Sequence, residues 1–107
     1  MHAFDVLGDP VRRRILELLA EGELTSGAIG AVVQQEFGIT QPAVSQHLKV
    51  LRDSGMVTVR GDAQRRIYAL EVSGLDELEA WLACCRRFWA ARLDTLERRL
   101  QEEERGT

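Results

Sequence analysis

Short polar, amide and basic side chains gather between residues 40 and 52, where they cover one face of a predicted helix. Apolar residues at helical spacing, Val44, Leu48 and Leu51, form the opposite, buried face. The outward side chains are those of Gln41, Pro42, Ser45, Gln46, Lys49 and Arg52. Amides pair with adenine edges, serine pairs with either kind of base, and the free N–H groups near Thr40 suit a phosphate. This pattern predicts hydrogen bonding to double-stranded DNA.

Three arginines lie near the tip of a predicted hairpin that follows this helix. Arg60, Arg65 and Arg66 are placed to reach a phosphate or the minor groove. Arg66 has the alternative of pairing with a carboxylate of its own domain. Both the wing arginines and the outward face of the helix could instead be ordinary solvated surface. A solvated helix face, however, more often carries Glu and Lys pairs.

A second basic cluster, residues 12–14, and one internal histidine have mainly structural interpretations. Three consecutive arginines cannot share one helix face, so exposure and local salt bridges are expected, with at most one or two of them contacting DNA. His47 lies beside the buried stripe, which favours a packed side chain with a local hydrogen bond over a phosphate contact. A metal-ligand role is not expected, because His2 is the other histidine of the chain.

The two cysteines, Cys84 and Cys85, are adjacent and form no disulfide framework. Packing as small hydrophobic side chains is the expected role. They remain weak candidates for a metal site, because a dimer would gather four thiols near one axis. In that alternative, soft metal, arsenite or an oxidant would switch the protein through thiol chemistry.

The first half of the chain is predicted to form four helices. A short first helix around Phe4 and Leu7 ends near Gly8, and Asp9 caps a second helix that starts with Pro10 and ends near Gly22. Its inward positions are Val11, Ile15, Leu18 and Leu19. Thr25 or Ser26 caps a third helix that Gly38 stops, with Ile29, Val32, Val33 and Phe37 inward. The fourth helix runs over Thr40–Ser54, so the last two form a helix-turn-helix.

The second half is predicted to form a β-hairpin, or wing, over residues 57–70, followed by a long helix from about Gly74 to about Glu103 with Ser73 as its cap. Apolar residues recur along that helix at steps of three and four: Leu75, Leu78, Leu82, Cys85, Trp89, Leu93, Leu96 and Leu100. This stripe is long for one small domain. Pairing with a second copy is the simplest way to bury it.

The predicted fold is therefore mostly α with a small β-hairpin, a winged helix-turn-helix in the order α-α-α-α-β-β-α. The 107 residues suffice for one domain, 1–107, of which about 103–107 form a frayed acidic tail. The net charge is −3, but five bases between residues 40 and 70 face only two acids, so one face can still bind DNA.

Other classes of protein are less compatible with the chain. No apolar run approaches a membrane span and the N-terminus does not read as a secretory signal, so a cytoplasmic protein is expected. An enzyme is not expected, because there is no glycine-rich phosphate loop and no Ser/His/Asp or Cys/His set. A winged-helix module that binds another protein is an alternative, which the acidic ends and the long apolar helix would suit.

Several segments resemble the ArsR/SmtB-type (arsenic-repressor) family of winged helix-turn-helix regulators. "LGDPVRRRILELL" at Leu7–Leu19 resembles the family's opening signature, "TQPAVSQHLKVLRDSGMV" at Thr40–Val57 its recognition helix, and "RRIYAL" at Arg65–Leu70 its second wing strand. "FWAARLDTLERRL" is similar to the last helix of a metal-independent branch. Segment 28–37 is about one helical turn longer than is usual in the family.

The resemblance implies a homodimeric repressor whose recognition helices occupy successive major grooves of a pseudo-palindromic operator. Many members of the family bind metal ions. One of their metal sites uses a Cys-x-Cys pair at a position that here reads Leu-Thr-Ser-Gly, residues 24–27. A second site uses a histidine on the last helix, and this last helix contains no histidine. No metal or other cofactor is therefore expected, and the sequence identifies no effector. The apolar stripe of the last helix places Leu75, Leu78, Leu82, Cys85, Trp89, Leu93 and Leu96 in the interface of such a dimer.

Overall fold

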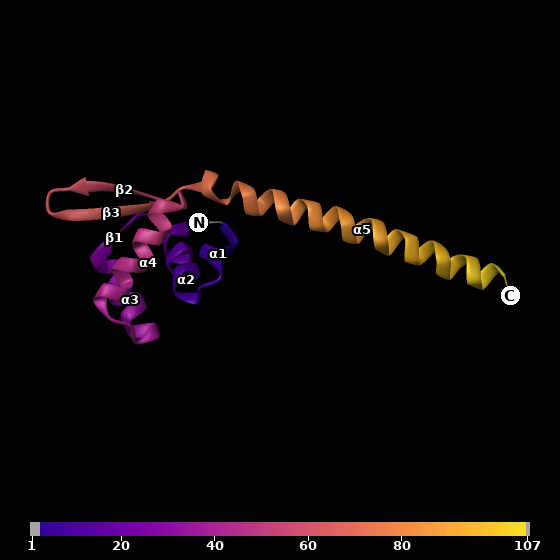
Figure 1. Ribbon diagram of the computed structural model, residues 1–107, viewed down its shortest axis with the longest axis horizontal. Coiled ribbons are helices and arrows are strands. Elements are labelled where there is room, and N and C mark those ends of the chain that lie inside the picture. The colour runs from indigo at the N-terminus through magenta and orange to yellow at the C-terminus, as the bar shows by residue number, and fades with distance from the viewer. Residues whose placement is uncertain (1–2, 107) are drawn as a thin grey trace. The chain divides into compact units, whose positions relative to one another are not determined.

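The computed structural model describes residues 3–106, and its contacts divide the chain into two compact units between Asp76 and Glu77. His2 and Thr107, the last residue of the predicted tail, lie outside the described residues. The first unit holds four helices and the strands (Figure 1). The second consists of most of the last helix. Within residues 3–106, no helix combines the length and apolar character needed to cross a membrane.

Helices α1 (Ala3–Leu7) and α2 (Pro10–Ala20) meet at a capped junction. The Asp9 carboxylate accepts hydrogen bonds from the main-chain N–H groups of Val11 and Arg12, at 2.8 and 3.2 Å. Pro10 occupies the first helical position, where its missing N–H removes no helical bond. The predicted start of this helix is confirmed, and its end falls at Ala20, just before Gly22.

Helices α3 (Ser26–Phe37) and α4 (Gln41–Asp53) form the predicted helix-turn-helix. The hydroxyls of Thr25 and Thr40 cap them by accepting from the N–H groups three residues later, at 3.1 and 3.3 Å. Gly38 ends α3 in the left-handed region, at φ 66°, which glycine adopts without strain. The chain can therefore turn sharply into α4.

The inward face of α3 differs from the prediction at two positions. Ile29 and Val33 are fully buried as expected, but Val32 is half-buried and Phe37 is exposed. Phe37 continues the apolar stripe but is the last residue of the helix, where the chain turns away. Gly30 is buried instead, which lets α3 and α4 approach closely.

The sheet has three strands, so the predicted order lacked one element. Strands β2 (Val57–Asp62) and β3 (Arg65–Leu70) form the expected antiparallel hairpin, with Val59 opposite Tyr68. A short strand β1 (Leu24–Thr25) pairs with the other edge of β3, giving the order β1-β3-β2. Two residues are too few to show a period-two pattern, so sequence periodicity could not reveal β1.

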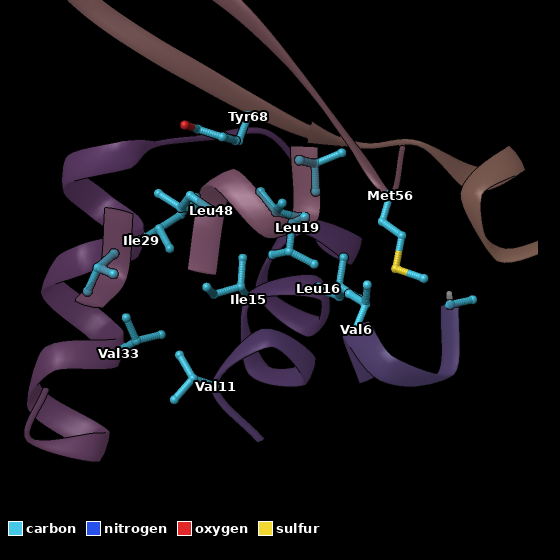
Figure 2. Close-up of a cluster of buried hydrophobic side chains, with 14 residues drawn as sticks. Val6, Val11, Ile15, Leu16, Leu19, Ile29, Val33, Leu48, Met56 and Tyr68 are labelled. Atoms are coloured by element: carbon cyan, nitrogen blue, oxygen red, sulfur yellow. The ribbon is translucent and has the colours of Figure 1, made fainter. Parts of the chain in front are cut away.

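The core of the first unit is made by side chains from α1 to α4 and from the start of the sheet, as Figure 2 shows. Each fully buried aliphatic side chain contributes roughly 1.5–3 kcal/mol to the free energy of unfolding. Because Val44, Leu48 and Leu51 anchor α4 in this core, the opposite face of that helix is held outward. The buried residues are Ala3, Val6, Val11, Ile15, Leu16, Leu19, Ile29, Val33, Val44, Leu48, Leu51, Met56, Val57 and Tyr68.

The last helix begins slightly later than predicted. Residues 72–75 form a 3-10 turn capped by Glu71, whose carboxylate accepts from the Ser73 N–H and hydroxyl at 3.3 and 2.9 Å. Ser73 therefore does not cap the helix, and α5 runs over Asp76–Arg105. Gly74 permits the turn, because a Cβ there would overlap Gly55 O.

The Asp9 cap predicts a pH-dependent stability. Burial alone would raise the pKa of Asp9, but main-chain hydrogen bonds from Arg12 and Val11, with the charges of His47 and Arg12, hold that pKa below 3.8. A carboxyl with a lowered folded pKa adds stability above its unfolded pKa and loses it as the pH falls through the folded value.

We therefore expect Asp9→Ala to lower the free energy of unfolding by about 1 kcal/mol at pH 7 and by less at pH 3. Asp9→Asn is the matched control, because its amide oxygen caps the helix without titrating. Urea unfolding at the two pH values measures the effect. An Asp9→Ala difference that is equal at pH 3 and pH 7 would contradict the role given to the charge.

Candidate nucleic-acid interface

The outward face of α4 is placed as the sequence predicted. All seven of its candidate residues are exposed, while Val44, Leu48 and Leu51 are buried on the other side. These seven are Thr40, Gln41, Pro42, Ser45, Gln46, Lys49 and Arg52. The helix therefore presents amide, hydroxyl and cationic groups to an external partner.

A hollow of about 280 Å³ joins this face to the sheet. It brings together five of the residues predicted to bind DNA. It also adds the hydroxyl groups of Ser26 and Tyr68, which were not predicted to belong to the site: Ser26 was a possible helix cap, and Tyr68 was part of a strand. Tyr68 is 5% exposed. Polar groups around a concave surface can bind a phosphate and reach base edges together. The lining residues are Ser26, Gln41, Ser45, Leu48, Lys49, Arg52, Arg66 and Tyr68.

The cations of the interface fall into two groups. Within residues 3–106, Lys49 and Arg66 have no carboxylate partner. The other three predicted cations are in ion pairs: Arg60 with Glu23 at 2.7 Å, Arg65 with Asp62 at 3.2 Å and Arg52 with Asp53 at 3.7 Å. These pairs are solvent-exposed, and exposed pairs contribute little, so a phosphate can replace the carboxylate.

The basic cluster of α2 bonds within the protein, but mainly between helices rather than through the local salt bridges that the sequence favoured. Arg12 donates to Val6 O at 2.7 Å and Arg13 donates to Leu7 O at 2.6 Å, which ties α1 to α2. Arg14 donates to both carboxylate oxygens of Glu36, at 2.9 and 3.1 Å, and this hydrogen bonding lowers the pKa of Glu36. These arginines therefore connect helices.

His47 is packed, as expected. Its side chain is 18% exposed, and its Nδ1 lies 3.4 Å from Arg12 Nη1 and 4.0 Å from Asp9 Oδ1. It connects α4 to the junction between α1 and α2. No group of three or more His, Cys, Asp or Glu side chains suited to a metal ion occurs within residues 3–106. Cys84 is exposed and Cys85 half-buried, both as free thiols.

The apolar stripe that is predicted to form the dimer interface runs along α5. Leu82, Trp89, Leu93 and Leu96 are 41–61% exposed, whereas Leu75, Leu78 and Cys85 are half-buried. Near the middle of the helix, the rings of Phe88 and Trp89 meet edge to face with centroids 6.2 Å apart. An open groove of about 500 Å³ runs along this helix beside both rings. Apolar side chains dominate this face, with Arg92 and Arg99 beside the groove, and its exposure leaves it available to a partner.

Comparisons with known proteins agree with this architecture. A family model described as bacterial regulatory protein, arsR family, matches residues 9–59. The chain is 40% identical over 91 residues to the HTH-type transcriptional regulator Rv2034 of Mycobacterium tuberculosis, covering 85% of this chain and 78% of that one. It is 31% identical over 81 residues to the transcriptional repressor SdpR of Bacillus subtilis, covering 76% and 86%.

Solved structures similar to this one include two transcriptional regulators. The ArsR family transcriptional regulator RHA00566 superposes with a TM-score of 0.70 at 30% identity, covering 81% of this chain and 86% of that chain. The transcriptional repressor BigR from Xylella fastidiosa superposes with a TM-score of 0.56 at 34% identity, covering 76% and 80%. The winged helix fold is thus shared with transcriptional regulators.

Proposed function

Because the chain belongs to the arsR family of DNA-binding transcriptional regulators, we propose that it works as a homodimeric repressor on a pseudo-palindromic operator. In this proposal α4 enters the major groove and the wing, residues 57–70, contacts the flanking backbone. Occupancy of the operator blocks transcription. Relatives named as repressors, among them SdpR, support repression of transcription rather than activation.

The observation that carries the proposal is the hollow between α4 and β3. Lys49 and Arg66 converge there without carboxylate partners among the described residues, beside the amide of Gln41 and the hydroxyl of Ser45. Cations without internal partners favour a phosphate, and the amide and hydroxyl are suited to base edges. An ordinary solvated surface gives no reason for cations from both α4 and β3 to line the same hollow.

The homodimer is supported by α5. Exposed leucine and tryptophan side chains recur along the helix, and burying each one fully is worth roughly 1.5–3 kcal/mol. A second copy presents the same stripe, so two such helices can cover one another symmetrically. The two recognition helices of a dimer then read two half-sites.

We propose further that DNA binding needs no metal and no other cofactor, that the protein is not an enzyme, and that it acts in the cytoplasm. The metal proposal is supported by residues 24–27, which carry no thiol, and by the absence of histidine from α5. The remaining donors, Cys84 and Cys85, are neighbours on one helix, where adjacent side chains point about 100° apart.

The test is a titration of a selected operator with the metal-free protein, in the presence and absence of zinc, arsenite and peroxide. We expect sequence-selective binding of equal affinity throughout, and the same for a Cys84→Ser, Cys85→Ser variant. Failure to bind any duplex selectively would overturn the proposed function. A loss of affinity that requires the cysteines would instead establish a repressor switched by thiol chemistry.

A further inference from the structure

Gln34, on α3, contacts the first residue of the recognition helix. It lies outside the site predicted from the sequence and is half-buried. In the amide orientation that satisfies its neighbours, its nitrogen lies 3.2 Å from Gln41 Oε1 and 3.3 Å from Gly30 O, and its oxygen lies 3.2 Å from Gln41 N. One side chain thus holds both the main chain and the side chain of Gln41.

Two main-chain groups determine which end of the Gln34 amide faces which neighbour. A main-chain N–H only donates and a carbonyl only accepts. The amide oxygen of Gln34 must therefore face Gln41 N, and its nitrogen must face Gly30 O. The Gln41 N–H is one of the donors that the start of a helix leaves unsatisfied, so Gln34 also caps α4 from outside.

The orientation of the Gln41 amide follows from that of Gln34. Because the nitrogen of Gln34 points at the Gln41 side chain, the Gln41 atom that receives it is the oxygen. Gly30 leaves room for this contact, since a Cβ there would lie 3.2 Å from Gln41 Oε1. Within residues 3–106, the Gln41 amide nitrogen has no hydrogen-bond partner, and Gln41 lines the hollow.

We propose that Gln34 is a positioning residue that makes Gln41 a hydrogen-bond donor toward DNA. In the major groove, guanine O6 and N7, thymine O4 and adenine N7 accept hydrogen bonds, whereas cytosine presents only the donor of its amino group. Gln41 therefore disfavours cytosine on the strand that it contacts, and favours guanine or thymine, which present no donor there, over adenine, whose N7 acceptor lies beside its amino donor. This inference rests on the proposed function, because it assigns Gln41 to a base edge.

Gln34→Glu tests the inference by reversing the polarity of the contact. An ionised carboxylate only accepts, so it loses the bond to Gly30 O, keeps the bond from Gln41 N and turns the Gln41 amide to donate to it. Gln41 Oε1 then faces the DNA and accepts from cytosine or adenine. We expect the preferred base pair at one position of each half-site to invert, with a preference of about fivefold for a single hydrogen bond.

Gln35→Glu is the matched control, because it adds the same charge at the exposed neighbouring position of α3. Affinities for duplexes carrying each of the four base pairs at every half-site position are compared for the three proteins. Inversion in Gln34→Glu alone supports the inference, and identical profiles for wild type and Gln34→Glu overturn it. A wild type without any base preference would instead sink the proposed function.

Gln34→Met keeps the test decisive should the carboxylate prevent folding. Methionine is a good helix former of similar length that neither donates nor holds Gln41. We expect discrimination to flatten about fivefold at the same single position and to persist elsewhere. Undiminished discrimination at every position in this variant overturns the inference.

Discussion

Replacing Leu82 and Trp89 together with glutamate is expected to convert the protein to monomers, or to unfold it, and to lower operator affinity at least a hundredfold. Both side chains are exposed in the single chain, 41% and 61%, and both lie on the apolar stripe of α5. A dimer would have to bury both new charges of each chain without partners, which costs far more than the stripe gains. A monomer also loses the second half-site, and linked binding of two sites is worth about 10²–10⁴ in affinity.

Sedimentation equilibrium at micromolar concentration measures the assembly, and circular dichroism reports whether the variant is folded. Arg98→Glu is the control, since it lies nine residues after Trp89, two and a half turns along, and therefore on the opposite side of the helix. The control should remain dimeric. A wild-type protein that sediments as a monomer would contradict the homodimer.

Removing the polar groups that we propose to contact the bases should abolish sequence preference while leaving general DNA affinity. The variant replaces Gln41, Ser45 and Gln46 with alanine, three exposed positions on α4. Each lost base contact is expected to cost about 1–3 kcal/mol, so the preference for operator over unrelated duplex should fall by more than a hundredfold. The cations are untouched, so the salt dependence should not change.

Lys49→Ala is expected to have the opposite effect, lowering general DNA affinity while leaving sequence preference unchanged. It should weaken binding to operator and to unrelated duplex alike and reduce the slope of affinity against salt by about one. Gln35→Ala is the neutral control, because it removes an exposed amide from α3 instead. A triple variant that keeps its full sequence preference would refute the assignment of these three residues.

Local signals made most of the fold predictable. Asp9, Thr25 and Thr40 carry side-chain oxygens at helix starts, and each caps a helix in the structure. Helical spacing identified the buried side of α4, and therefore also its exposed side. Strand β1 was not predicted because it depends on pairing with β3, which is distant in sequence, and the exposure of Phe37 was not predicted because the helix ends at that residue.

The residues of the candidate site that lie on α4 could be predicted from the sequence. The hollow also needs Ser26 and Tyr68, which α3 and β3 bring beside α4 through tertiary packing. The ion pair of Arg60 with Glu23 likewise joins the wing to the loop before β1. Gln34 left no signal, since a glutamine inside a helix reads as an ordinary surface residue. Its role comes from the approach of α3 to α4 at Gly30.

Footprinting of the wild-type protein on duplexes selected from a random pool tests the central claim most directly. A homodimer reading DNA through α4 requires an inverted repeat whose half-sites lie 34–36 Å apart, about 10 base pairs, or a multiple of that spacing. We expect the selected duplexes to carry such a repeat, with two chains bound and both half-sites protected. Selection of a single asymmetric site bound by one chain, or of no preferred sequence, would contradict the account.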